Sequence, residues 1–231
     1  MRTYEQDWLN VETNQVHQMH EDPTLGRRWF LQMGDACAKY NVTIQLCMSQ
    51  MRHIMQSVEI PAVTNARASP DFGGPGGTND FLGGVNSILG FALGIMPSKD
   101  TWRSIPDYKQ VTAENCWHNA ASATFSCGPV TPSDPVGKTN VSLVMRSCDA
   151  AGRLLQPDRP AMLMDAAMHA AAFSSIDSVG WKGPFAAVWM VSGVRFMYVL
   201  GLGNAVGMGT LGYSNTTRAL RAFEARSPIR T

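Results

Sequence analysis

A short N-terminal segment, Tyr4–Trp8, places a carboxylate and an aromatic side chain next to each other, as Asp7 and Trp8. A carboxylate attacks or stabilises the anomeric carbon of a sugar, and an indole packs against the apolar face of a sugar ring. The pair is therefore typical of carbohydrate chemistry. A helix cap or a charged strand end gives the same pattern, and this alternative stays open.

A second segment with chemical potential is Arg67–Phe72, which contains Asp71 and again follows an apolar stretch. An arginine near an aspartate orients the carboxylate or binds a substrate hydroxyl. The alternative is a surface turn, because Ser-Pro-Asp is ordinary turn chemistry.

A third segment, Ser98–Trp102, offers Asp100 for sugar hydroxyls and Trp102 for a ring face. The alternative here is a solvated loop. Each of the three segments is weak alone, and all three follow a stretch that reads as a strand.

Other motifs of the sequence give no site. The glycine-rich residues 73–77 lack the Lys-Ser/Thr of a phosphate-binding loop. His17 and His20 have no third metal ligand at a suitable spacing. The five cysteines contain no CxxC pair, so we expect buried free thiols. The sequence predicts neither a metal site nor an organic cofactor.

Composition narrows the possible partners. The formal net charge of +1 gives no sign of a nucleic-acid or acidic-membrane surface. No apolar run reaches the ~18–20 residues that cross a bilayer. The N-terminus lacks the apolar core of a signal peptide, whereas sequons at Asn41, Asn140 and Asn215 would suit a secreted parent protein. The compartment therefore stays open.

The elements that must position these residues alternate between strands and helices up to about residue 150. This alternation predicts a parallel sheet, either in a β/α barrel or in an open doubly wound fold. We expect a polar loop over residues 10–21. The expected strands cover residues 2–8, 43–48, 61–67 and 94–96, and the expected helices start near Asp22 and cover residues 53–59, 80–91, 114–126 and 140–147.

Beyond residue 150 the pattern changes. Glycine and proline become frequent, and residues 186–191 and 194–200 read as a hairpin around Ser192-Gly193. We therefore expect residues 1–150 to form the catalytic domain and residues 151–231 to begin a smaller β domain with a loosely ordered tail.

The order of these motifs resembles glycoside hydrolase clan D, and most closely the raffinose synthase and alkaline α-galactosidase branch of family 36. The resemblance covers roughly residues 4–165, and Tyr4–Trp8 falls where the family has its nucleophile strand. The motifs that carry it, in the order of the family, are Cys47–Ser49, Arg67–Phe72, Met96–Trp102, Cys127–Asn140 and Gly152–Pro160.

The resemblance implies an α/β fold, with the C-terminal portion of a (β/α)8 TIM-type barrel followed by part of a β-sandwich. It implies a retaining glycoside hydrolase or transglycosidase for α-galactoside-type sugars, with Asp7 as nucleophile and Asp71 as acid/base. Two departures are that Glu5-Gln6 stands where the family has a lysine, and that Pro70 replaces an acidic residue. The implied substrate-binding residues are Trp8, Cys47, Arg67, Asp100 and Trp102.

Two other interpretations remain. The first half of the family's barrel is absent, so the second interpretation is a fragment that pairs with a missing half-barrel or with itself. It would then be a catalytically inactive fragment or a carbohydrate-binding remnant. An open α/β nucleotide-binding protein is the third interpretation, but the sequence contains no phosphate-binding motif.

Overall fold

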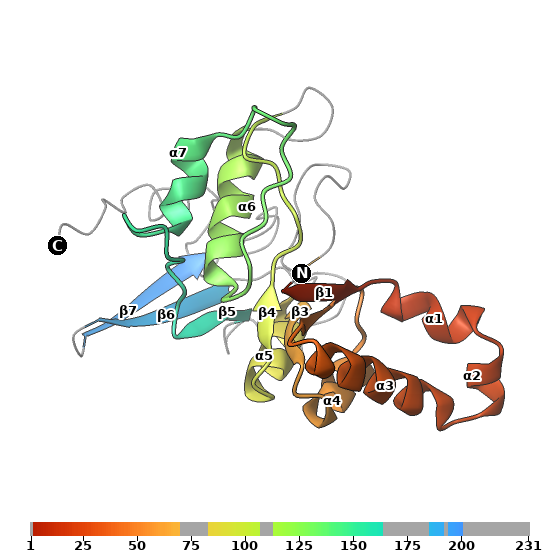
Figure 1. Ribbon diagram of the computed structural model, residues 1–231. Helices are drawn as coiled ribbons and strands as arrows, with labels where there is room; N and C mark the ends of the chain where they lie inside the picture. The colour runs from red at the N-terminus through yellow and green to blue at the C-terminus, as the bar shows by residue number, and fades with distance from the viewer. Residues whose placement is uncertain (1, 70–82, 107–112, 164–184, 192–193, 201–231) are drawn as a thin grey trace, which may run out of the picture. The chain divides into compact units, whose positions relative to one another are not determined.

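The computed structural model describes residues 2–69, 83–106, 113–163, 185–191 and 194–200 (Figure 1). The chain divides into two compact units. The first comprises residues 1–67 and 89–97, and the second comprises residues 68–88 and 98–231. The predicted boundary near residue 150 remains a prediction.

A four-stranded parallel sheet confirms the mixed α/β class and the parallel pairing that the sequence predicts. Its strands lie in the order β1-β2-β3-β4, which is also their order along the chain. Helices separate the strands because parallel neighbours need a crossover connection. The strands are β1 (Thr3–Gln6), β2 (Thr43–Leu46), β3 (Val63–Arg67) and β4 (Met96–Ser98).

The helices that connect these strands match the sequence expectation in part. Residues 10–21 were expected as a polar loop, and this expectation is wrong because two short helices form there. Leu9, which has no exposed surface, anchors the first of them in the core. The helices are α1 (Leu9–Gln15), α2 (Gln18–Glu21), α3 (Leu25–Lys39), α4 (Met51–Gln56), the 3-10 turn η1 (Ser57–Glu59) and α5 (Gly83–Ala92).

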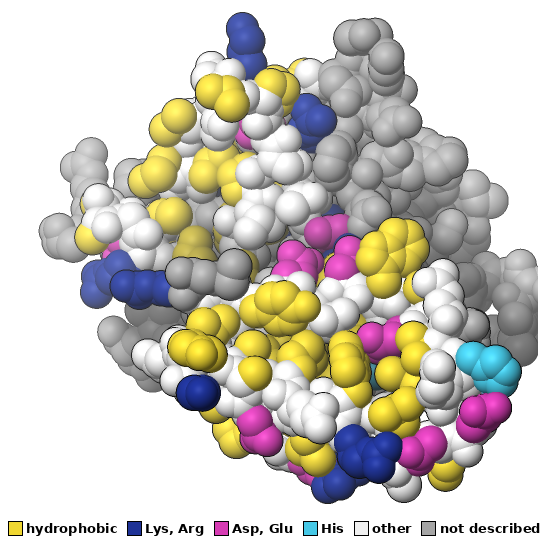
Figure 2. Space-filling view, turned by 45° about the vertical axis from the view of Figure 1, so that its right-hand side comes forward, with side chains coloured by type: hydrophobic (Ala, Val, Ile, Leu, Met, Phe, Trp, Pro, Cys, Tyr) yellow, Lys and Arg dark blue, Asp and Glu magenta, His cyan; other side chains and the backbone are white. Residues whose placement is uncertain are grey.

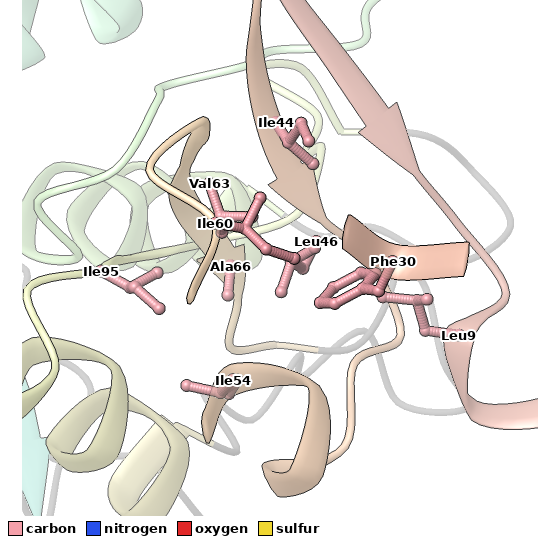
Figure 3. Packing of buried hydrophobic residues seen from close by; sticks show 9 residues of the cluster. All are labelled: Leu9, Phe30, Ile44, Leu46, Ile54, Ile60, Val63, Ala66 and Ile95. Atoms are coloured by element: carbon pink, nitrogen blue, oxygen red, sulfur yellow. The ribbon is translucent and has the colours of Figure 1, made fainter. Parts of the chain in front are cut away.

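The core of the first unit lies between the helices and one face of the sheet. In β2, Ile44 and Leu46 are completely buried, whereas Thr43 and Gln45, which alternate with them, are half-buried. Phe30 from α3 and Ile54 from α4 pack into the same cluster. Burying each such side chain contributes about 1.5–3 kcal/mol. The cluster, shown in Figure 3, contains Leu9, Phe30, Ile44, Leu46, Ile54, Ile60, Val63, Ala66 and Ile95.

The second unit contains α6 (Ala113–Phe125), α7 (Val141–Val144) and a 3-10 turn, η2 (Met145–Ser147). All three fall where the sequence predicts helices. None of the helices in the described ranges combines the length and the apolarity that crossing a membrane requires.

An antiparallel sheet of the second unit confirms the predicted hairpin. It runs in the order β5 (Arg159–Leu163), β6 (Phe185–Val191) and β7 (Val194–Leu200). Strand β5 was not expected, because Pro160 reads as a strand breaker. A proline is tolerated on an edge strand, and β5 lies at the edge of this sheet. The predicted β-sandwich is left as a prediction, and residues 201–231 lie outside the described ranges.

Candidate active site

Three of the predicted site residues come together at the carboxyl ends of three neighbouring strands. Asp7 directly follows β1, Cys47 directly follows β2, and Arg67 is the last residue of β3. The pairing of Gln6 with Leu46, and of Leu46 with Ala66, brings the next residue of each strand to the same level of the sheet. In parallel α/β sheets this edge is where ligands bind.

The Cys47 thiol is the central group of this cluster. Arg67 donates a hydrogen bond from Nη1 to Cys47 Sγ over 3.1 Å. Burial raises the pKa of the Cys47 thiol, the side chains of Asp7 and Glu5 raise it further as hydrogen-bond partners, and Arg67 lowers it. The thiol therefore stays protonated at neutral pH and is a poor nucleophile.

Asp7 is held by its own neighbours. The backbone N–H of Trp8 donates to Asp7 Oδ1 over 2.7 Å, and Gln6 Nε2 donates to the Asp7 carbonyl over 2.9 Å. The Trp8 side chain is 60% exposed, so its indole is open to a ligand.

Two neighbouring strands end in the same unusual backbone conformation. Trp8 has φ 59° and Met48, directly after Cys47, has φ 48°. A residue with a Cβ pays about 1–2 kcal/mol in this left-handed region. Such positions concentrate at functional sites. Their occurrence at two neighbouring strand ends therefore favours a functional site at this edge of the sheet.

A second row of polar side chains lies one step further down the same strands. Asn65 Nδ2 donates to Gln45 Oε1 over 2.9 Å, and Gln45 Nε2 donates to Glu5 Oε1 over 3.3 Å. Below them, Thr3 Oγ1 and Thr43 Oγ1 are 2.9 Å apart. We call these two rows, together with the site above, the polar face: Thr3, Glu5, Asp7, Thr43, Gln45, Cys47, Asn65 and Arg67.

In β2 the polar face alternates with core residues, because successive side chains of a strand point to opposite faces. Sequence reasoning identified only the residues at the strand ends and missed Glu5, Gln45 and Asn65. The alternation of Gln45 with the apolar Ile44 and Leu46 was the available signal.

Asp100 and Trp102 belong to the second unit. The Asp100 backbone N–H donates to Ser69 Oγ over 2.9 Å, and Asp100 Oδ1 accepts from the Thr101 N–H over 2.7 Å. Trp102 has no exposed surface and forms a β-bridge with Pro132. Its indole Nε1 is buried without a hydrogen-bond partner among the described residues. The roles of both residues in substrate binding remain predictions.

Asp71 lies outside the described residues, so the structure gives no distance between its carboxyl group and that of Asp7. The described residues contain no group of three or more histidine, cysteine, aspartate or glutamate side chains that would hold a metal ion.

On the face shown in Figure 2, acidic and basic side chains are interspersed with apolar ones.

The second unit also buries two ionisable side chains that the sequence did not single out. Lys99 is 2% exposed and His118 on α6 is 3% exposed. Burial, together with the positive charge of Lys99, lowers the pKa of His118 to about 4. His118 is therefore neutral at physiological pH.

No protein-family model matches the chain, and no curated protein matches it.

Proposed function

We propose that the protein is a retaining glycoside hydrolase or transglycosidase for α-galactoside-type sugars, with Asp7 as the nucleophile and Asp71 as the acid/base. The observation that carries this proposal is the meeting of Asp7, Cys47 and Arg67 at the carboxyl ends of three adjacent parallel strands. A carboxylate, a protonated donor and a fixed cation suit a sugar with several hydroxyl groups.

The topology supports a β/α barrel as the framework of this site. The strands follow one another in sequence order, as they do around a TIM-type barrel, whereas doubly wound folds reverse direction at a switch point. The side chains of α3 and α4 pack on one face of the sheet, and the opposite face is the polar face. In the proposal, the four strands are the C-terminal portion of such a barrel, and the polar face is part of its interior.

In the proposed mechanism, Asp7 attacks the anomeric carbon as Asp71 protonates the departing glycosidic oxygen. A covalent bond forms between the Asp7 carboxylate and the sugar, and the leaving group departs as an alcohol. Asp71 then removes a proton from water or from an acceptor hydroxyl, which attacks the same carbon and releases Asp7. Retention requires the two carboxyl groups to lie about 5–5.5 Å apart.

Neighbouring groups position the reactants in this proposal. The protonated Cys47 thiol donates to the Asp7 carboxylate, which fixes the direction of attack. Arg67 binds a sugar hydroxyl beside the nucleophile, and the exposed Trp8 indole packs on the ring. In this mechanism the Asp7 carboxylate carries the covalent step and the Asp71 carboxyl group carries the proton transfers.

The test is turnover of 4-nitrophenyl α-D-galactoside and of raffinose by the wild type and by Asp7→Asn and Asp71→Asn. We expect each substitution to lower kcat/KM by a factor of about 10³ or more, as is typical of a nucleophile or acid/base. Asp35→Asn, on the exposed surface of α3, is the matched control and should leave the rate unchanged. A 2-fluoro galactosyl fluoride should label the peptide that contains Asp7. An unchanged rate in Asp7→Asn would exclude Asp7 as the nucleophile.

A second candidate function is carbohydrate binding without turnover. It is favoured by the 60% exposure of the Trp8 side chain, because an exposed indole is a typical sugar platform. Galactose would then quench tryptophan fluorescence, and Trp8→Ala would remove the quenching while no substrate is cleaved. Cleavage of either galactoside decides in favour of the enzyme.

A further inference from the structure

We draw no further inference here: the strongest candidate, the buried side-chain cluster on α6 in which His118 Nε2 and Ser122 Oγ have no hydrogen-bond partner among the described residues, carries none, because its position beside Lys99 rests on a pKa shift alone and nothing in the described part of the chain shows what would bind there.

Discussion

Arg67 on β3 donates a hydrogen bond to the Cys47 thiol at the end of β2, with 3.1 Å between Nη1 and Sγ. The bond joins two strand ends that are twenty residues apart in sequence. Asp7 at the end of β1 acts on the same sulfur. Cys47 is therefore the group through which a carboxylate and a guanidinium are coupled.

This coupling predicts the reactivity of Cys47. Only the thiolate is alkylated, and burial and the two carboxylates raise the pKa of Cys47. We expect iodoacetamide to leave Cys47 unlabelled at about pH 8, because the thiolate of Cys47 forms only at a much higher pH. Asp7→Asn removes a group that raises this pKa, so labelling of Cys47 should begin at a lower pH.

The measurement is peptide mass spectrometry after alkylation at a series of pH values, and Asp35→Asn serves as the control. Rapid labelling of wild-type Cys47 at neutral pH would contradict the protonated thiol. An identical pH dependence in Asp7→Asn would show that Asp7 does not act on the sulfur.

The local pattern of the sequence was sufficient for most of the fold. The spacing of Leu25, Trp29 and Met33 predicts the helix that the structure has as α3, and the apolar residues 43–48 predict β2. Pattern failed where tertiary contacts decide. Residues 10–21 look polar, yet Leu9, the first residue of α1, is completely buried in the core.

The site could be predicted only in part. Residues after strands are visible in a sequence, which is why Asp7, Cys47 and Arg67 were found. Glu5, Gln45 and Asn65 depend on the register between strands, and a shift of one residue would turn them to the other face. No local pattern determines that register.

His53 predicts a loss of stability in acid. Its Nδ1 accepts a hydrogen bond from the Gln50 backbone N–H over 3.0 Å, and burial lowers its pKa from 6.5 to about 4. The unfolded chain therefore binds a proton at a higher pH than the folded chain does. Stability is fully present above about pH 6.5 and falls as the pH drops toward about 4, by up to ~3 kcal/mol for this group.

The measurement is urea unfolding at about pH 7 and about pH 5. His53→Gln keeps an acceptor at this capping position but cannot titrate, so the variant should lose less stability than the wild type between these pH values. His118 titrates in the same direction and leaves a residual slope. The exposed His20→Gln is the control, and a slope in His53→Gln equal to that of the wild type would refute the prediction.

Asn140 caps the short helix α7. Its Oδ1 accepts from the Leu143 backbone N–H over 3.2 Å and from Ser142 Oγ over 2.8 Å. Asn140→Ala should lower the free energy of unfolding by about 1 kcal/mol. Asn140→Asp keeps the acceptor and should retain the stability, as measured by urea unfolding. Equal losses in the two variants would show that the cap contributes nothing.

Two glycines of α3 should respond to alanine in opposite ways. At Gly34 an added Cβ would overlap Cγ2 of Ile60, which is itself 3% exposed and held in the core. At Gly26 no atom lies within 4 Å of such a Cβ. Alanine gains up to about 1 kcal/mol over glycine in a helix interior, whereas overpacking a core costs about 1–3 kcal/mol.

We therefore expect Gly26→Ala to raise the free energy of unfolding by about 0.5–1 kcal/mol. Gly34→Ala should lower it by about 1–2 kcal/mol, since the overlap with Ile60 exceeds the gain in helix propensity. Both values come from urea unfolding of the same chain. If Gly34→Ala proved as stable as Gly26→Ala, the close packing of α3 against Ile60 would be wrong.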